Sequence, residues 1–547
     1  MGGWLYSIFR GKENHTVSGA ALVIAVFGVA SRLLGFIRDR LLAGMFGAGD
    51  VLDAYYAAFR IPDFLYGLLI AGALSAAFVP IFTEVREKRG DEAAWKLSSG
   101  ILFLVLFILG GISLLAILAA ESLVRLLVPG FSPEKQALTT MLTRIMLLGP
   151  VFLGVSAVFG SVLVSFRNFF VFSLAPVFYN VGIITGVLLF SKLWGPAGLA
   201  FGVVFGTLLH AAIQYPSVRS AGFRIFVRDG AELRRDVWRV VSLMIPRSLG
   251  VAVGQVSFVA VTFFASALAS GTLASFTLAN NIQSVPLGLF GVAFSLAAFP
   301  TLSAYAAREK RVEFAAILEK TCRQVLFFVV PVSVLMLALR AQIVRIILGT
   351  GEFDWEDTRA TFDILGALSI SLFAQSLTPL FARAFFSLQD TKTPLLVALV
   401  SEAVHIAVLF FFVGSWGPVT LAISFSVASI VNAFLLFFLL KRRMEGWGGR
   451  AFFFATLKMA LASLVALGAV QSGKFFFAIG NVELDTFAEV LLQLLFSGFL
   501  GVFAFLIAAS LFRVEEVESV RSFLVSRFLR NPGVLKEAEE ESNRGTV

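Results

Sequence analysis

Long apolar runs are the feature that most constrains what this chain can fold into. The sequence returns repeatedly to stretches of about 20 mainly apolar residues, which is the length an α-helix needs to cross a bilayer. Because the runs are continuous and do not alternate every second residue, they argue against a membrane β-barrel. We therefore predict an all-α, polytopic membrane protein. We count about fourteen spans, at 17–37, 53–82, 98–120, 138–164, 169–191, 196–216, 240–269, 272–303, 324–347, 361–386, 394–414, 417–440, 452–473 and 486–512.

The composition excludes several other classes of protein. Only 14% of residues are charged and the mean hydropathy is +0.89, whereas a soluble domain carries about 25% charged residues. The single cysteine, Cys322, excludes an internal disulfide, and the three histidines are far apart in sequence, so no metal motif is expected. The net charge of +9 is explained by basic cytoplasmic loops, and we predict no nucleic-acid partner.

Lysine and arginine are distributed unevenly between the loops. The loops after the second, sixth, eighth and twelfth predicted spans are strongly basic, whereas those after the fifth, seventh, eleventh and thirteenth hold two lysines between them. Because basic loops stay in the cytoplasm, we predict that both termini are cytoplasmic. We interpret residues 1–16 as an interfacial segment, and residues 514–547 as a cytoplasmic amphipathic stretch followed by a charged tail.

The chain contains an internal repeat. The sequence LWGPAGLA at 193–200 returns as SWGPVTLA at 415–422, which places Trp194 and Trp416 222 residues apart. At the same spacing SFRN at 165–168 meets SLQD at 387–390, and Gly49 meets Gly271. These matches indicate the duplication of a six-helix unit. Since six is even, both copies enter the membrane in the same orientation, related by a pseudo-two-fold axis along the membrane normal.

The repeat predicts the domain organisation. The first lobe (17–230) holds spans 1–6, the second lobe (231–445) holds spans 7–12, and two extra spans occupy 446–513. Two such bundles can enclose a central cavity and rock to open it to each side in turn, as transporters do.

The first two predicted spans carry charges that a bilayer disfavours. A charge at the bilayer centre costs about 2.5 kcal/mol or more, so these residues need a cavity or a partner. Arg32 and Asp39 are seven residues apart and share one helical face, and so do Asp53 and Arg60. Pro62 is expected to kink or break the second span. One interpretation is that each pair simply neutralises itself.

The alternative interpretation is a site for an anionic headgroup. Guanidinium groups bind phosphate with two parallel hydrogen bonds, and the second half of the chain supplies Asn280, Asn281 and Gln283 at the matching depth. Arg38 and Arg40 need no site, because long side chains at a helix end can reach the headgroup region.

Glu402 and His405 are a further polar pair inside a predicted span. They are three residues apart and share a helical face. Two interpretations of this pair remain: it is a coupling site for an ion or proton, or it is a simple interhelical hydrogen-bond pair. The sequence shows no catalytic triad, carboxylate pair or Walker A motif, so we predict neither an enzyme nor an ATP cofactor. Transport would then depend on the membrane potential, Na⁺ or H⁺.

Three stretches of the sequence resemble a known family. The segment SRLLGFIRDRLLAGMFGAGDVLDAYYAAFRIPDFL at 31–65, VPLGLFGVAFSLAAFPTLS at 285–303 and ARAFFSLQDTKTP at 382–394 are similar to the MurJ (MviN) lipid II flippases. These belong to the multidrug/oligosaccharidyl-lipid/polysaccharide exporter superfamily. The resemblance implies fourteen helices, a cytoplasmic-membrane location in bacteria and export of a peptidoglycan precursor for the cell wall. It also implies that the last two spans form a groove for the lipid tail.

The resemblance also implies a substrate site. In the family, basic residues of a central cavity bind the pyrophosphate of lipid II, a sugar linked to a polyprenyl chain. The matching positions kept here are Arg32, Arg38, Asp53 and Arg60. Together with Asp39, Asn280 and Asn281, which the pattern of polar residues adds, they are the residues expected to bind the substrate.

The chain departs from the family pattern at several of these places. Tyr66, Gly67 and Ala71 stand where the family usually has two arginines and a glutamate, and Asn280–Asn281 replaces an Asp-Arg pair. The chain is therefore either a divergent lipid II flippase, a flippase for another polyprenyl-linked polysaccharide, or an ion-coupled drug exporter. A non-transporting scaffold or enzyme is a more distant alternative. We expect membrane lipids as further partners, and a monomer.

Overall fold

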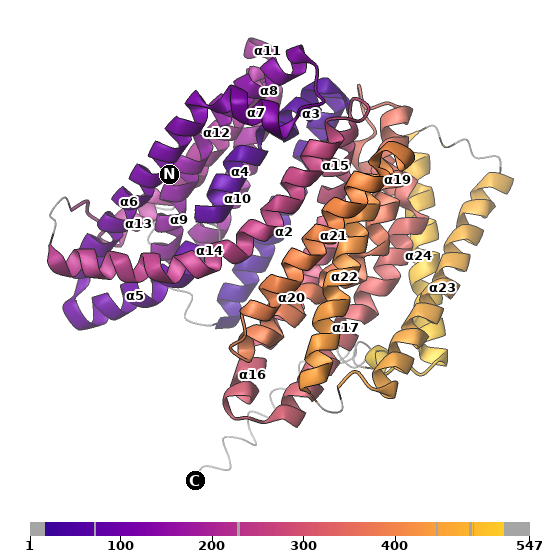
Figure 1. The fold of residues 1–547 in the computed structure, drawn as a ribbon. Helices are drawn as coiled ribbons and strands as arrows, with labels where there is room; N and C mark the ends of the chain where they lie inside the picture. Colours follow the sequence, from indigo (N-terminus) through magenta and orange to yellow (C-terminus); the bar gives the residue numbers. More distant parts are fainter. Residues whose placement is uncertain are drawn as a thin grey trace, which may run out of the picture. The chain divides into compact units, whose positions relative to one another are not determined.

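The computed structural model describes residues 17–69, 73–226, 230–444, 447–480, 484 and 486–518. Within these ranges all regular elements are helices, as Figure 1 shows, so the predicted all-α class is confirmed. The predicted interfacial segment 1–16, most of the predicted tail and Ala71 lie outside the described residues.

The helices group into two compact units. Unit 1 consists of Met1–Val285, Val344–Leu368 and Leu395–Ala428, and unit 2 of Pro286–Ile343, Ser369–Pro394 and Ser429–Val547. The helices of unit 1 are α2 (Val17–Phe46), α3 (Asp50–Ala58), α4 (Arg60–Leu69), α5 (Ala73–Arg89), α6 (Asp91–Leu118), α7 (Ala120–Leu127), α8 (Pro133–Met146), α9 (Gly149–Ser165), α10 (Phe169–Thr185), the π-helix η1 (Gly186–Phe190), α11 (Ser191–Trp194), α12 (Ala197–Ala212), α13 (Tyr215–Ser220), α14 (Ala231–Ala265) and α15 (Thr272–Pro286).

Unit 2 and the helices shared by the two units complete the chain. Unit 2 holds η2 (Leu287–Val292), α16 (Ala293–Ala307), α17 (Arg311–Ala338), α20 (Leu372–Ser387), α23 (Arg450–Ile479) and α24 (Phe487–Leu511). The shared helices are α18 (Arg340–Leu348), α19 (Trp355–Ile370), α21 (Lys392–Trp416) and α22 (Val419–Arg443).

Most of the predicted spans coincide with helices long and apolar enough to cross a membrane. Among the described residues there are 10 such helices, or 11 if α19 and α20, which meet at 47°, form one broken span. The three other predicted spans fall on α2, on α3 to α5, and on α14, and these helices carry the buried charges or long polar ends. The count of fourteen therefore stays a prediction.

The second predicted span is interrupted where the sequence suggested. Helix α3 ends at Ala58, Phe59 lies in a turn, and α4 begins at Arg60. Pro62 follows in the first turn of α4. Because its ring has no N–H and clashes with the carbonyl four residues earlier, a continuous helix through this point is disfavoured. Because of this break, the charged residues of α4 do not lie on the continuation of the helical face that carries the charged residues of α3.

The two copies of the repeat share unusual backbone geometry. Arg167 and Gln389, which are 222 residues apart, both adopt a left-handed conformation, with φ of 55° and 59°. Gly195 and Gly417, at the same spacing, have φ of 57° and 60°. Hydrogen bonds repeat as well: the N–H of residue 168 donates to the carbonyl of 163, and that of 390 to 385. Non-glycine residues rarely adopt this conformation, so the agreement supports a common origin.

Glycines bring α10 and α12 into close contact in unit 1. A Cβ atom on Gly182 would lie 2.2 Å from the Cα of Gly206, and one on Gly202 would lie 2.4 Å from the Cα of Gly186. Gly182 of α10 and Gly186 of η1 are four residues apart, as are Gly202 and Gly206 of α12, and this spacing lets membrane helices approach closely. The close packing of this part of the first lobe therefore requires glycine at these positions, where a side chain would overlap the neighbouring backbone.

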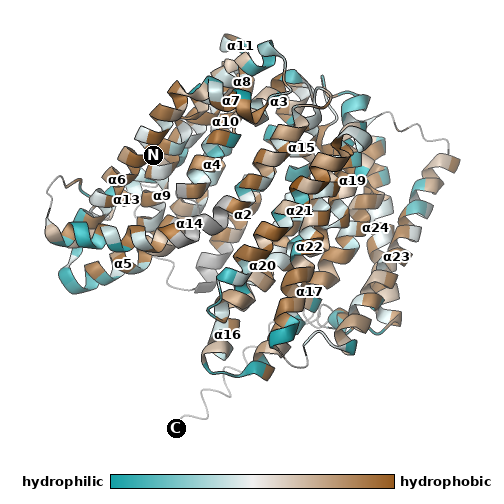
Figure 2. Ribbon diagram, viewed as in Figure 1, coloured by the Kyte–Doolittle hydropathy of each residue, from teal (hydrophilic) through white to brown (hydrophobic). Residues whose placement is uncertain are grey.

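Hydrophilic residues of unit 1, coloured teal in Figure 2, gather at the end of α5 and the beginning of α14, and many of them are charged. Arg239 donates to Glu84 at 2.9 Å, and Arg89 donates to the buried Asp236. These residues come from loops that the positive-inside rule assigns to the cytoplasm. The contact joins the basic loop after the second predicted span to the basic loop after the sixth.

In unit 2 an acidic residue anchors the turn between α20 and α21. Asp390 accepts hydrogen bonds from the N–H and hydroxyl of Thr393, at 2.9 and 2.6 Å, and an ion pair from Arg443 at 2.7 Å. Burial raises the pKa of this carboxyl, but the bonds from Thr393 and the charge of Arg443 outweigh it and hold the pKa below its ordinary value.

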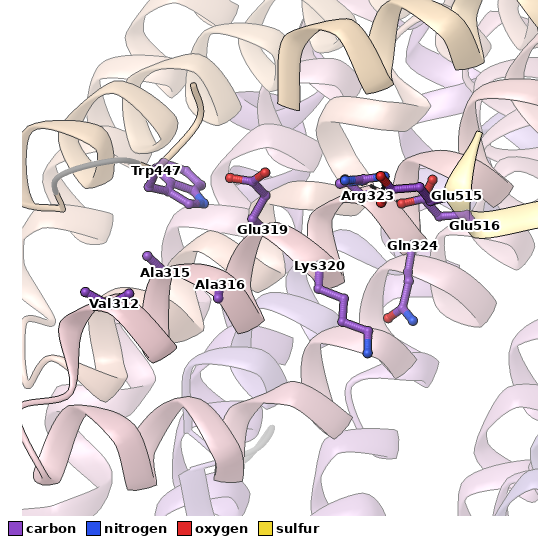
Figure 3. Close-up of a pocket in the computed structure, with 10 residues that line it drawn as sticks. All are labelled: Val312, Ala315, Ala316, Glu319, Lys320, Arg323, Gln324, Trp447, Glu515 and Glu516. Atoms are coloured by element: carbon purple, nitrogen blue, oxygen red, sulfur yellow. Dashed lines mark hydrogen bonds and ion pairs between the residues drawn. The ribbon is translucent and has the colours of Figure 1, made fainter. Parts of the chain in front are cut away.

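Unit 2 also contains a hollow of about 520 Å³ beside α17 (Figure 3). Arg323 donates to Glu516 at 2.6 Å and to Glu515 at 2.7 Å, which ties α17 to the segment that follows α24. The hollow holds none of the predicted site residues. It is lined by Val312, Ala315, Ala316, Glu319, Lys320, Arg323, Gln324, Trp447, Glu515 and Glu516.

Candidate functional site

A polar cavity of about 300 Å³ lies inside unit 1. It takes side chains from α2, α3, α4 and α10 of the predicted first lobe, and from α14 and α15 of the predicted second lobe. In helices that are otherwise apolar, such a group of polar side chains marks a candidate binding site. The lining residues are Arg38, Leu42, Tyr55, Tyr56, Phe59, Arg60, Asp63, Tyr179, Gln255, Phe258, Thr277, Asn280 and Asn281.

Arg38 is held in one orientation by its neighbours. Its Nε and Nη2 donate to Oδ1 of Asp39 at 2.9 and 2.7 Å, and its Nη1 donates to Asn180 at 3.1 Å. The other oxygen of Asp39, which is only 3% exposed, accepts from Asn281 at 3.0 Å. Asp39 therefore links α2 to α15 and fixes the guanidinium at the cavity wall.

Arg60 is held by neutral groups. Its Nε donates to the hydroxyl of Thr262 at 2.9 Å and its Nη2 to that of Thr277 at 3.4 Å, and the guanidinium lies 5.3 Å from the ring centre of Phe258. Among the described residues no carboxylate lies within ion-pair distance of it, although Asp63 lines the same cavity. Asp63 attracts the guanidinium at longer range, while Nε and Nη2 donate to hydroxyl groups that a ligand oxygen can displace.

Asp53 lies in a different place from the cavity. It is buried and accepts from the N–H groups of Gly271 and Ala274, both at 2.8 Å, and from Lys135 at 2.7 Å. The suggested pairing of Asp53 with Arg60 is therefore wrong in this structure, because the break at Phe59 separates the two faces. Asp53 stabilises the beginning of α15.

Arg32 also lies apart from the cavity. It is exposed, and it is not among the lining residues. The suggested pairing of Arg32 with Asp39 is wrong as well, because the adjacent Arg38 takes that carboxylate. Asn280 and Asn281, by contrast, both line the cavity as expected.

Glu402 and His405 are in direct contact on α21. The Nδ1 atom of His405 lies 3.1 Å from Oε1 of Glu402, and Ser257 of α14 donates to the other carboxylate oxygen. His405 is fully buried, and its Nε2 has no hydrogen-bond partner. The two residues share a helical face, and their contact fits both a hydrogen-bond pair and a coupling site, so the role stays a prediction. In the described part of the chain no cluster of ligands suits a metal ion.

Several cavity residues could not be found from the sequence. Lys135, the partner of Asp53 outside the cavity, lies in the first turn of α8 behind the capping Ser132 and precedes the fourth predicted span. Tyr179, Gln255 and Thr277 are ordinary polar residues within spans, and only the packing of distant helices places them in one cavity.

One departure from the family pattern has a visible structural counterpart. A Cβ atom at Gly67 would lie 2.8 Å from the amide nitrogen of Gln255. The Gln255 side chain therefore occupies the space beside a position where the family usually has an arginine.

Comparisons with known proteins identify the family. The family model described as "Lipid II flippase MurJ" matches residues 42–497. A probable lipid II flippase MurJ of Rhizobium tropici is 31% identical over 475 residues, covering 84% of this chain and 86% of the relative.

Solved structures agree with the sequence comparison. The structure titled "Lipid II flippase MurJ, inward closed conformation" superposes with a TM-score of 0.75 at 26% identity, covering 91% of this chain and 100% of that one. An inward-facing multidrug resistance MATE family transporter of the MOP superfamily shares the fold, with a TM-score of 0.62 at 15% identity and 77% and 98% coverage. The chain belongs to the MurJ family of lipid II flippases.

Proposed function

We propose that this chain moves lipid II across the bacterial cytoplasmic membrane by alternating access, for cell wall synthesis. Membership of the family supports the substrate. The observation that carries the mechanism is the polar cavity, in which two guanidinium groups face residues from both predicted lobes. A pyrophosphate is the kind of ligand that guanidinium groups bind well.

Arg60 would make the main contact with the pyrophosphate. Its hydrogen-bond partners are hydroxyl groups, which a phosphate oxygen can replace without leaving a carboxylate unpaired. Arg38 would add a second contact, positioned by Asp39. The amide groups of Asn280 and Asn281 suit hydroxyl and phosphate oxygens of the headgroup. Arg32, which is exposed, would act when the substrate enters or leaves.

Transport would follow from rocking of the lobes 17–230 and 231–445, with both termini in the cytoplasm. Each charge that crosses the membrane potential gains about 2.3 kcal/mol per 100 mV, so the potential can bias the motion. Glu402, with Ser257 and His405 around it, is the candidate site for coupling to H⁺ or Na⁺. We propose that the protein works as a monomer and is not an enzyme.

Rescue of cells depleted of their lipid II flippase tests the proposal. Arg60→Ala should abolish rescue and Arg60→Lys should keep part of it, whereas Arg125→Ala, at an exposed ion pair, should rescue fully. Immunoblots of the membrane fraction would show that all variants insert. Full rescue by the double variant Arg38→Ala, Arg60→Ala would overturn the site.

A binding assay separates the proposed substrate from its alternatives. Purified protein should bind lipid II more tightly than polyprenyl pyrophosphates that carry other sugars. Preference for another sugar would indicate a different polysaccharide flippase, and binding of hydrophobic cations with no affinity for polyprenyl pyrophosphates would indicate a drug exporter.

A further inference from the structure

A second hollow in unit 1 adjoins the polar cavity. It measures about 850 Å³ and lies between α4, the end of α6, α7 and α14, with one further contact from α21. Of its lining side chains, all except Arg60 are apolar. Leu115 and Leu126 are largely exposed, and Phe263 is partly exposed. The hollow is therefore a lateral groove with an apolar floor, open where a membrane protein faces lipid.

Arg60 lines both the groove and the polar cavity. Among the described residues that line the two spaces, Arg60 is the one they share, because Arg38 and Asp63 line only the cavity. In this structure its Nε and Nη2 are bonded to Thr262 and Thr277. The side chain thus stands at the junction of a polar compartment and an apolar one, with a positive charge at the point where they meet.

We propose that the groove holds the hydrocarbon chain of an anionic polyprenyl lipid whose headgroup occupies the polar cavity, with Arg60 at the phosphate. The proposal rests on the proposed function and adds to it a path for the chain. A molecule that fills both spaces must be polar at one end, apolar along its length and negatively charged between the two. A compact drug lacks the apolar length, and a neutral lipid lacks the charge that Arg60 would pair with.

The groove lies on different helices from those to which the family resemblance assigns the lipid tail. The family resemblance assigns the lipid tail to the two extra spans, which correspond to α23 and α24, whereas this groove is built from α4, α6, α7 and α14. The end of α6 and helix α7 follow the third predicted span, on the side that the positive-inside rule assigns to the outside. The groove would therefore hold the chain in the outer half of the bilayer, beside the site from which the headgroup is released.

The test compares two neighbouring leucines of α6. Leu115 lines the groove and is 67% exposed, while Leu114 is 58% exposed and lies outside the lining. Leu115→Trp and Val256→Trp narrow the groove, and Leu114→Trp is the matched control. Binding to the purified proteins is measured with lipid II carrying its natural polyprenyl chain, and with an analogue that has the same headgroup on a chain of two isoprene units.

We expect the two groove variants to weaken binding of the long-chain lipid alone. Leu115→Trp and Val256→Trp should weaken binding of the long-chain lipid roughly tenfold, as the loss of about two buried methylene contacts would, and should leave the short-chain analogue unaffected. Leu114→Trp should change neither. Equal affinity of the unaltered protein for both lipids, or equal effects of the three variants, would overturn the groove. Failure of the unaltered protein to bind either lipid would instead count against the proposed function.

Photo-crosslinking gives a second readout that does not depend on affinity. A long-chain polyprenyl pyrophosphate with a photoreactive chain end should label peptides from 112–127 and 256–264. Labelling confined to other helices would overturn the proposal. Equal labelling of these peptides by a phospholipid with the same photoreactive group would show a general lipid contact and would overturn it as well.

Discussion

Replacing Asp53 by asparagine should destabilise the protein strongly. The Asp53 side chain is 2% exposed and its partner Lys135 is 8% exposed, so the substitution leaves a buried ammonium group with one remaining partner, Asp50. Removing one member of a buried ion pair costs about 3–5 kcal/mol. The two N–H groups at the start of α15 also share a weaker acceptor, and an unsatisfied N–H costs about 1–3 kcal/mol.

The cost of the broken ion pair and the cost of the unsatisfied N–H group cannot simply be added, because the side-chain oxygen that remains in asparagine can still accept one of these hydrogen bonds. We therefore expect a total loss of about 3–5 kcal/mol for Asp53→Asn, as in a broken buried pair. The matched control is Asp50→Asn, which touches the same Lys135 but whose side chain is 65% exposed. An exposed partner contributes about 1 kcal/mol or less. The two variants remove the same chemical group from the same lysine and differ in burial.

Thermal unfolding of the purified variants in one detergent is the assay. The Tm of Asp53→Asn should fall by several degrees more than that of Asp50→Asn. Adding Lys135→Met to Asp53→Asn should recover part of the loss, because it removes the unpaired charge. Equal Tm values for the two single variants would refute the reasoning. A stable Asp53→Asn protein that fails to rescue flippase-depleted cells would instead favour a role in substrate binding.

Three further predictions concern packing, pH and coupling. Gly202→Val should lower the yield of folded protein in size-exclusion chromatography, because its side chain would overlap the backbone of Gly186 in η1, whereas Gly110→Val, with open space around it, should not. Asp390→Asn should lower the Tm at neutral pH; because the folded carboxyl has a lowered pKa, its contribution is full above its ordinary pKa of 3.8 and fades as the pH falls through lower values. The Tm difference should therefore shrink in acid, and Arg443→Met should show the same trend. Glu402→Gln should abolish the dependence of transport on the proton or sodium gradient in vesicles, and an unchanged dependence would exclude Glu402 as the coupling site.

The sequence was sufficient for the fold class and for part of the site. Continuous apolar runs leave an α-helix as the element that satisfies its own backbone in a bilayer. The charges of the opening segment pointed to Arg60, the family resemblance added Arg38, and the second half of the chain supplied Asn280 and Asn281. The pairing of those charges could not be predicted. Spacing along an ideal helix suggested Asp53 with Arg60, but the break at Phe59 changes the faces that the two residues present.

The remaining site residues depend on distant parts of the chain. Gln255 and Tyr179 are far apart in sequence, and neither belongs to a motif. They line the cavity because their helices pack against each other in the folded protein. The periodicity of the sequence along one helix does not show which other helices pack against it. Lys135 shows the same limit, since its carboxylate partners precede it by more than 80 residues.

The matching left-handed turns at Arg167 and Gln389, and at Gly195 and Gly417, suggest which parts of the ancestral unit had to be kept after duplication. A bend is hard to change, because one altered torsion redirects everything that follows it. An interior side chain can be exchanged with far less disturbance. One copy could therefore keep the charges that meet a cargo while the other lost them, without either losing the shape that both inherited.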